Sequence, residues 1–71
     1  MDYAELHLNL IEQGFQKINT QDFITNFKVN FKKESETITV HWLMGGYVKS
    51  ISTVKEEFGC PIVFLDSFSN N

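Results

Sequence analysis

The residues whose types could do chemistry are few, and they stand far apart in the chain. Cys60, His41 and Asp66 together offer the residue types of a nucleophilic triad. A triad is defined by geometry, however, and any chain of this composition contains such a trio. Cys60 directly precedes a proline, where a cysteine is more often a small buried apolar side chain. We therefore expect no enzyme activity, and a small enzyme using Cys60 is the weakest alternative.

Metal binding and acid–base chemistry lack the local patterns that they need. Zinc sites draw three or four ligands from paired cysteines or histidines, whereas His7, His41 and Cys60 each stand alone. The paired carboxylates of Glu34–Glu36 and Glu56–Glu57 fall in polar stretches, where nothing predicts the desolvation that acid–base catalysis requires. The sequence therefore predicts no metal site, no cofactor and no catalytic residue.

Two adjacent glycines, Gly45 and Gly46, allow three interpretations. A phosphate-binding loop would need the glycine-rich spacing or the Gly-Lys-Ser/Thr pair of nucleotide-binding motifs, and neither is present. A hinge into a helix is supported by the capping-box pattern of Thr53–Glu56 and by the stop signal Gly-Cys-Pro. A hairpin turn is favoured, because both central positions of a two-residue turn need positive φ. We expect a turn, a strand over about 47–51, and a short helix near 53–58.

The segment 23–44 is expected to form the centre of a sheet, and this sheet positions the candidate residues named above. Apolar and polar side chains alternate over 23–31 and again over 37–44, which is the strongest secondary-structure signal in the chain. The polar stretch 33–36 is the predicted turn. One register places every large apolar side chain on a single face, so the register is well specified. Its pairs are Phe31 with Ile38, Val29 with Val40, and Phe27 with Trp42.

An amphipathic helix is predicted to precede this hairpin. The pattern Asp2-x-x-Glu5 is typical of a helix start. The apolar arc is wider than a core-facing helix needs, and we expect Leu6 and Leu10, at its outer part, to contact a second subunit. Gly14 either ends the helix in a left-handed cap, with Phe15 folding back on Leu10, or lies inside the helix. The stripe expected to face the sheet consists of Ala4, Leu8, Ile11, Phe15 and Ile18.

The remaining residues complete one small α+β domain, residues 1–71. The run Ile62–Leu65 is apolar on both faces, which is typical of a strand covered on both sides, and Pro61 suits a strand start or an edge. A chain of 71 residues buries a low fraction of its surface, and its single cysteine excludes an internal disulfide. We therefore expect a homodimer or a subunit of a complex. The expected fold is an N-terminal helix packed on a mainly antiparallel sheet of three or four strands.

Charge is unevenly distributed along this acidic chain of net charge −3. The stretch 23–33 carries three lysines and no acid, and Lys28, Lys32 and His41 are expected to share the outer face of the hairpin. That surface is the basis of the alternative function, weak nucleic-acid binding. Against it stand the acidic total, the absence of arginine and the lack of aromatic side chains for base stacking on this face.

The amino end and the single thiol favour a cytoplasmic protein. The stretch MDYAELHLNL lacks the basic start of a secretory signal, and no apolar run approaches the roughly 20 residues that span a membrane. We therefore expect no membrane partner.

The expected function is that of a non-catalytic protein-binding module, an inhibitor or regulator that occludes a larger macromolecular partner. Small size, acidic flanks and missing catalytic motifs are shared by many inhibitors encoded by phages and other mobile elements, an analogy of class without a motif match. The residues expected to bind the partner are Tyr47, Lys49, Glu56 and Glu57. An aromatic side chain on a rigid turn can anchor an interface, and charges at its rim can steer association. The alternative is that Tyr47 only closes the end of the sheet against Met44.

Overall fold

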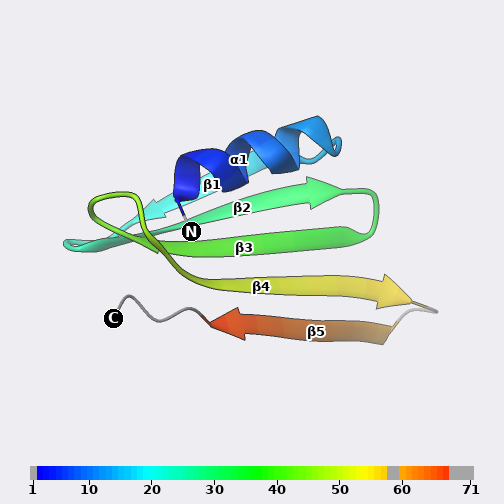
Figure 1. Cartoon of the computed structure of the whole chain (residues 1–71). Helices are drawn as coiled ribbons and strands as arrows, with labels where there is room; N and C mark the ends of the chain where they lie inside the picture. Colours follow the sequence, from blue (N-terminus) through cyan, green and yellow to red (C-terminus); the bar gives the residue numbers. More distant parts are fainter. Residues whose placement is uncertain (1, 58–59, 68–71) are drawn as a thin grey trace.

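The computed structural model describes residues 2–57 and 60–67, which form one helix packed on an antiparallel sheet of five strands (Figure 1). The strands pair in chain order, β1-β2-β3-β4-β5, each antiparallel to its neighbours. The predicted α+β fold is thus confirmed, but the prediction of three or four strands was too low. The elements are α1 (Tyr3–Glu12), β1 (Gln16–Asp22), β2 (Asn26–Lys33), β3 (Glu36–Leu43), β4 (Val48–Glu57) and β5 (Cys60–Ser67).

The central hairpin β2–β3 has the predicted register. Phe27 is opposite Trp42, Val29 is opposite Val40 and Phe31 is opposite Ile38. The chain reverses at residues 34 and 35, inside the predicted polar stretch, with Lys33 opposite Glu36. Alternating polarity therefore determined both the pairing and the buried face.

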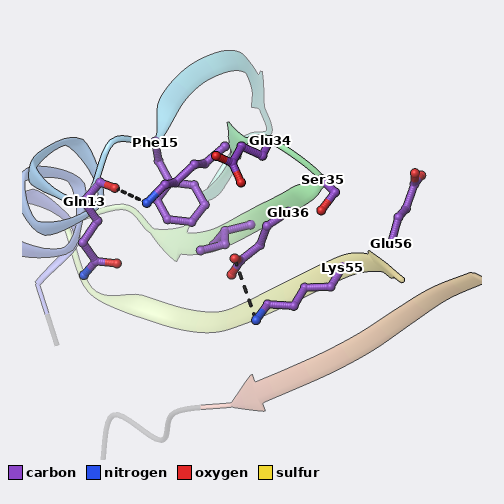
Figure 2. A pocket seen from close by; sticks show the side chains of 9 residues that line it. Gln13, Phe15, Glu34, Ser35, Glu36, Lys55 and Glu56 are labelled. Carbon is purple, nitrogen blue, oxygen red and sulfur yellow. Dashed lines mark hydrogen bonds and ion pairs between the residues drawn. The ribbon is translucent and has the colours of Figure 1, made fainter. Parts of the chain in front are cut away.

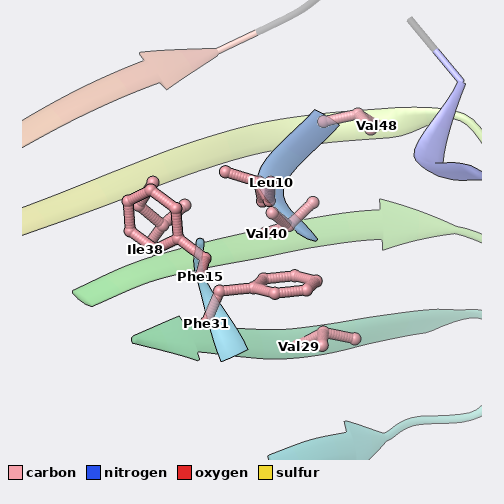
Figure 3. Close-up of a cluster of buried hydrophobic side chains, with 7 residues drawn as sticks. All are labelled: Leu10, Phe15, Val29, Phe31, Ile38, Val40 and Val48. Carbon is pink, nitrogen blue, oxygen red and sulfur yellow. The ribbon is translucent and has the colours of Figure 1, made fainter. Parts of the chain in front are cut away.

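The core lies between α1 and the face of β2, β3 and β4 that the helix covers (Figure 3). At one end of this layer, Trp42 is stacked between Tyr3 and Phe27, with ring centroids 4.4 Å from each. The core is therefore aliphatic at its centre and closed by aromatic rings at one side. Its buried members are Leu10, Phe15, Val29, Phe31, Ile38, Val40 and Val48.

The inward face of α1 differs from the predicted one. Leu10 is only 4 % exposed and Leu6 packs against the core, whereas Leu8 is 65 % exposed. Leu10 is therefore buried within the single chain and Leu6 is half-buried, so the structure gives the predicted contact of these two residues with a second subunit no support. The error arose because the predicted stripe continued through Ile18, which belongs to β1 and not to the helix.

Gly14 ends the helix, as one of the two interpretations predicted. Its φ is 95°, its N–H donates to the carbonyl of Ile11, and the N–H of Phe15 donates to the carbonyl of Leu10, both at 3.0 Å. This is the hydrogen-bond pattern of a Schellman cap, in which an apolar residue after the glycine packs back on the last helical turn. Phe15 and Leu10 do belong to the same buried cluster.

The predicted helix near 53–58 is a strand over its described residues. β4 continues to Glu57 and pairs with β3 on one side and β5 on the other, so the capping-box pattern of Thr53–Glu56 is overridden by pairing. The β-branched residues Ile51, Thr53 and Val54 suit this pleated position between two strands. Phe58 and Gly59 lie outside the described residues.

The Gly-Gly stretch is a turn, as predicted, but it is longer than a two-residue hairpin loop. The N–H of Gly46 donates to the carbonyl of Leu43 at 3.0 Å, so the central residues of the turn are Met44 and Gly45. A second bond, from the N–H of Leu43 to the carbonyl of Tyr47 at 2.8 Å, closes the loop. Gly45 and Gly46 have φ of 105° and 91°, a conformation that side chains with a Cβ rarely adopt.

Candidate functional site

The four predicted partner-binding residues lie at opposite ends of β4. Tyr47 directly precedes it, Lys49 is its second residue, and Glu56 and Glu57 are at its end. At about 3.3 Å per residue, even the nearer members, Lys49 and Glu56, are about 23 Å apart. The structure therefore brings Tyr47 and Lys49 together but does not join them to the two glutamates in one compact patch.

The loop between β1 and β2 and the loop between β3 and β4 lie at the same end of the sheet (Figure 1), and Tyr47 is one of several exposed apolar residues on them. The loop between β1 and β2 is joined to the loop between β3 and β4 by a hydrogen bond of 3.0 Å, from the N–H of Met44 to the carbonyl of Thr25. We call the large apolar side chains of these loops the loop-end surface. Its members, between 48 % and 91 % exposed, are Phe23, Ile24, Met44 and Tyr47.

The start of α1 fixes the loop that carries Tyr47. The N–H of Tyr3 donates to the carbonyl of Gly46 at 2.6 Å, and Asp2 forms an isolated antiparallel bridge with Tyr47. The carboxylate of Asp2 also caps the helix by accepting the N–H of Ala4 at 2.9 Å. One residue thus ties the helix start to the exposed loop, and the loop is held by backbone bonds on both sides.

A second exposed apolar surface runs along the outer strand β5. Among the described residues, β5 pairs with β4 alone, and its other edge is open (Figure 1). The prediction that this strand is covered on both sides is therefore wrong for the single chain, because α1 packs over β2, β3 and β4 and does not reach β5. The apolar run on this strand, between 39 % and 67 % exposed, is Ile62, Val63, Phe64 and Leu65.

The face of the sheet opposite α1 carries Lys28, Lys32 and His41, as predicted. The ring Nε2 of His41 lies 2.9 Å from the side-chain oxygen of Asn26. Burial lowers the pKa of His41 below its ordinary value of 6.5, and the charges of Lys49 and Lys28 lower it further. We call Lys28, Lys32, His41 and Lys49 the basic face.

Polar side chains on the same face bond one another across the strands. The hydroxyl of Thr39 donates to the side-chain oxygen of Asn30 at 2.6 Å, and the amide of Asn30 donates to Asn19. This row links β1, β2 and β3 through side-chain hydrogen bonds.

The trio of Cys60, His41 and Asp66 is not assembled. Cys60 and Asp66 are six residues apart on the single strand β5, which separates their backbones by about 20 Å. Within residues 2–57 and 60–67, no group of three or more His, Cys, Asp or Glu residues is placed to hold a metal ion.

A shallow hollow of about 400 Å³ lies at the end of the sheet opposite the loop-end surface (Figure 2). Phe15 and Ile38 line it among polar and charged side chains. The Nζ of Lys33 donates to the carbonyl of Gln13 at 2.7 Å, and the Nζ of Lys55 lies 4.0 Å from the carboxylate of Glu36. An exposed pair at this distance contributes little. The hollow is therefore a solvated hairpin end, and we assign no ligand to it.

Comparison with known proteins gives no guide to function. No protein-family model matches the chain, and no curated protein and no solved structure shows significant similarity to it.

The described part of the chain contains no helix with the length and apolar character needed to cross a membrane.

Proposed function

We propose that this protein is a non-catalytic protein-binding module, an inhibitor or regulator that occludes a larger protein partner through the loop-end surface. The observation that carries the proposal is the exposure of four large apolar side chains on two loops that are hydrogen-bonded to each other. Exposed apolar clusters on soluble proteins commonly mark interaction sites, and binding residues are often held on loops by a rigid scaffold.

The anatomy around this surface supports the proposal. Exposed polar side chains adjoin it: Asp22 precedes the first loop, Asp2 is bridged to Tyr47, and Lys49 follows the second loop. Protein interfaces typically have an apolar centre and a polar rim, and rim charges raise the rate and specificity of association. Tyr47 supplies the aromatic anchor that alanine scanning often finds at the centre of an interface.

Recovery of partners from native extract tests the proposal. The loop-end variant combines Ile24→Ser, Met44→Ser and Tyr47→Ser; the control combines Leu8→Ser and Ile11→Ser, which remove similar exposed apolar side chains from the outer face of α1. We expect wild type and control to retain the same protein partner. Loss of one central anchor commonly costs 2 kcal/mol or more, so the loop-end variant should bind at least about 30-fold more weakly. Equal affinity of all three proteins, at equal thermal stability, would contradict the proposal.

Nucleic-acid binding is the second candidate, and the basic face favours it. Although the chain is acidic overall, this face carries Lys28, Lys32 and Lys49. Among the described strand residues, the basic face has a single carboxylate, that of Glu56, which lies at the end of β4. If nucleic acid is the partner, affinity should fall steeply with salt and should be lost on Lys28→Glu with Lys32→Glu. In the recovery experiment, this candidate would appear as nucleic acid retained equally by wild type and the loop-end variant.

A further inference from the structure

The two edges of the sheet are built differently. β1 is polar except for Ile18, with a lysine at position 17 and an irregularity between Lys17 and Asn19 that breaks its pairing with β2. β5 pairs with β4 through eight successive residue pairs without a bulge, and its exposed centre is apolar. Proteins protect open edges with charges and bulges, because an exposed regular strand pairs with other chains. β1 is protected in this way, and β5 is not.

The backbone groups that β5 offers to its open edge can be derived from the pairing. The N–H of Glu56 donates to the carbonyl of Ser35 at 3.2 Å, so the peptide groups of Glu56 point toward β3 and away from β5. Opposite residues in an antiparallel pair point their groups either at each other or both away. Pro61 is opposite Glu56, so Pro61, and by alternation Val63 and Leu65, point outward. Pro61 has no N–H, and the missing N–H would have pointed to the open edge, where β4 does not need it. Proline is tolerated at such positions.

We infer that the open edge of β5 binds the same edge of a second copy of this chain, giving one continuous antiparallel sheet. The inference is independent of the proposed function, because it uses no residue of the loop-end surface. Its basis is the symmetry of the apolar run 61–65 about Val63. When Val63 lies opposite Val63 of the other copy, Ile62 lies opposite Phe64, and Pro61 lies opposite Leu65. Every position of the run then meets an apolar residue.

The same register satisfies the outward backbone groups. Val63 exchanges both of its bonds with Val63 of the second copy, and the N–H of Leu65 donates to the carbonyl of Pro61. Within the run 61–65, only the carbonyl of Leu65 is left without a donor, because Pro61 has none. A register centred on Phe64 instead would place Ile62 opposite a position outside the apolar run, and the hydrophobic pattern therefore selects Val63 as the centre.

The exposed apolar area of β5 limits the size of the contact. The exposed fractions of Ile62, Val63, Phe64 and Leu65 together equal a little more than two whole side chains. At about 150–200 Å² for a large apolar side chain, the exposed apolar area is roughly 400 Å² per copy, and this upper limit on the side-chain area buried is about half of what each partner contributes to a standard interface. We therefore expect a reversible dimer with a dissociation constant in the micromolar range.

Disulfide trapping tests the register directly. In a Cys60→Ser background, Val63→Cys places two thiols opposite each other across the two-fold axis, within the distance that a disulfide spans. We expect rapid formation of a covalent dimer. The matched control is Ile18→Cys in the same background, an exposed position on the protected edge β1, and it should cross-link at least about tenfold more slowly. Equal rates for the two variants would overturn the inference.

Sedimentation equilibrium of the uncross-linked protein supplies the second measurement. Wild type should show a monomer–dimer equilibrium over micromolar concentrations, and Val63→Lys should shift it to monomer while its melting temperature is retained, because Val63 is largely exposed. A wild-type protein that stays monomeric at several hundred micromolar would contradict the inference. So would a dimer that Val63→Lys leaves intact.

Discussion

At the scale of single residues, Trp42 is the side chain on which the aromatic end of the core depends. It is stacked between Tyr3 on the helix and Phe27 on β2, and its indole Nε1 is buried without a hydrogen-bond partner among the described residues. Removing the ring should therefore cost packing on two elements, whereas removing only the N–H should cost little, since that group gains nothing from the fold.

Two substitutions separate these contributions. Trp42→Ala should lower the free energy of unfolding by about 3–5 kcal/mol, which is a large part of the stability of a domain of this size. Trp42→Phe keeps an aromatic ring between Tyr3 and Phe27 while it removes the N–H and part of the ring area, so its loss should be clearly smaller than that of the alanine variant. Urea denaturation measures both. If the alanine variant unfolded at the same denaturant concentration as wild type, the assignment of Trp42 to the core would be wrong.

The second prediction at this scale concerns His41 and pH. Burial and the charges of Lys49 and Lys28 lower its pKa in the folded protein, whereas in the unfolded chain it keeps a pKa near 6.5. Between these two values the unfolded state binds the extra proton, so the folded protein loses stability as the pH falls through this window. The contribution is present in full above pH 6.5.

A variant isolates this contribution from other titrating groups. His41→Gln cannot titrate, and an amide at this position can still donate to the side-chain oxygen of Asn26. We expect wild type to lose more stability than the variant between about pH 7 and about pH 5, measured by denaturation at each pH. The histidine at position 7 and the carboxylates are common to both proteins. Parallel stability curves would show that His41 contributes nothing to the pH dependence.

At the scale of elements, Gly14 decides where the helix stops and where β1 begins. Its positive φ allows the two hydrogen bonds of the cap and turns Phe15 into the core. A Cβ at this position would meet only the end of the Lys33 side chain, no closer than 3.6 Å, so space does not require glycine. The backbone conformation does.

Gly14→Ala tests this interpretation. The left-handed conformation costs a residue with a Cβ about 1–2 kcal/mol, and the free energy of unfolding should fall by that amount. Gly14→Asn is the matched control, because asparagine tolerates this conformation better, and its loss should be smaller. Thermal or chemical denaturation distinguishes the two. An alanine variant as stable as wild type would mean that the cap is not maintained in solution.

Some of the strands can be predicted from the sequence, and others cannot. The β2–β3 register follows from alternation because one face of that hairpin is buried under α1. β1 was missed because it is exposed along its whole length and has Ile18 as its single apolar residue, so this edge strand has no alternation to detect. The end of β4 was assigned to a helix on a local capping pattern, and pairing with strands on both sides outweighed that pattern.

Predictions about surfaces failed for a different reason. The apolar run of β5 correctly indicated a strand. Whether another element covers that strand cannot be predicted from the run itself, and α1 lies over β2, β3 and β4 instead. The Gly-Gly turn pointed to Tyr47, whereas Ile24 and Met44 were hidden within strand-like patterns although they lie on neighbouring loops. The distance between Tyr47 and Glu56 follows from β4 being one long strand, which the predicted helix obscured.

At the scale of the whole molecule, the proposed surfaces are separate and compatible. In the proposed dimer, a two-fold axis between the two Val63 residues, perpendicular to the sheet, would reverse the direction of every strand in the second copy. The two loop-end surfaces therefore lie at opposite ends of the continuous sheet, and both copies of α1 lie on the same face. A dimer of this kind would present two equivalent contact sites to partners, and occupancy of one site would leave the other accessible.

The central claim is that the loop-end surface binds a larger protein, and site-specific photo-crosslinking in native extract tests it most directly. A photoreactive phenylalanine analogue is introduced at position 47 in one protein and at position 8 in another, since Tyr47 and Leu8 are similarly exposed on different parts of the molecule. We predict a discrete protein adduct from position 47 and none of that mass from position 8. Identical adducts from both positions, or an adduct from position 8 alone, would contradict the claim.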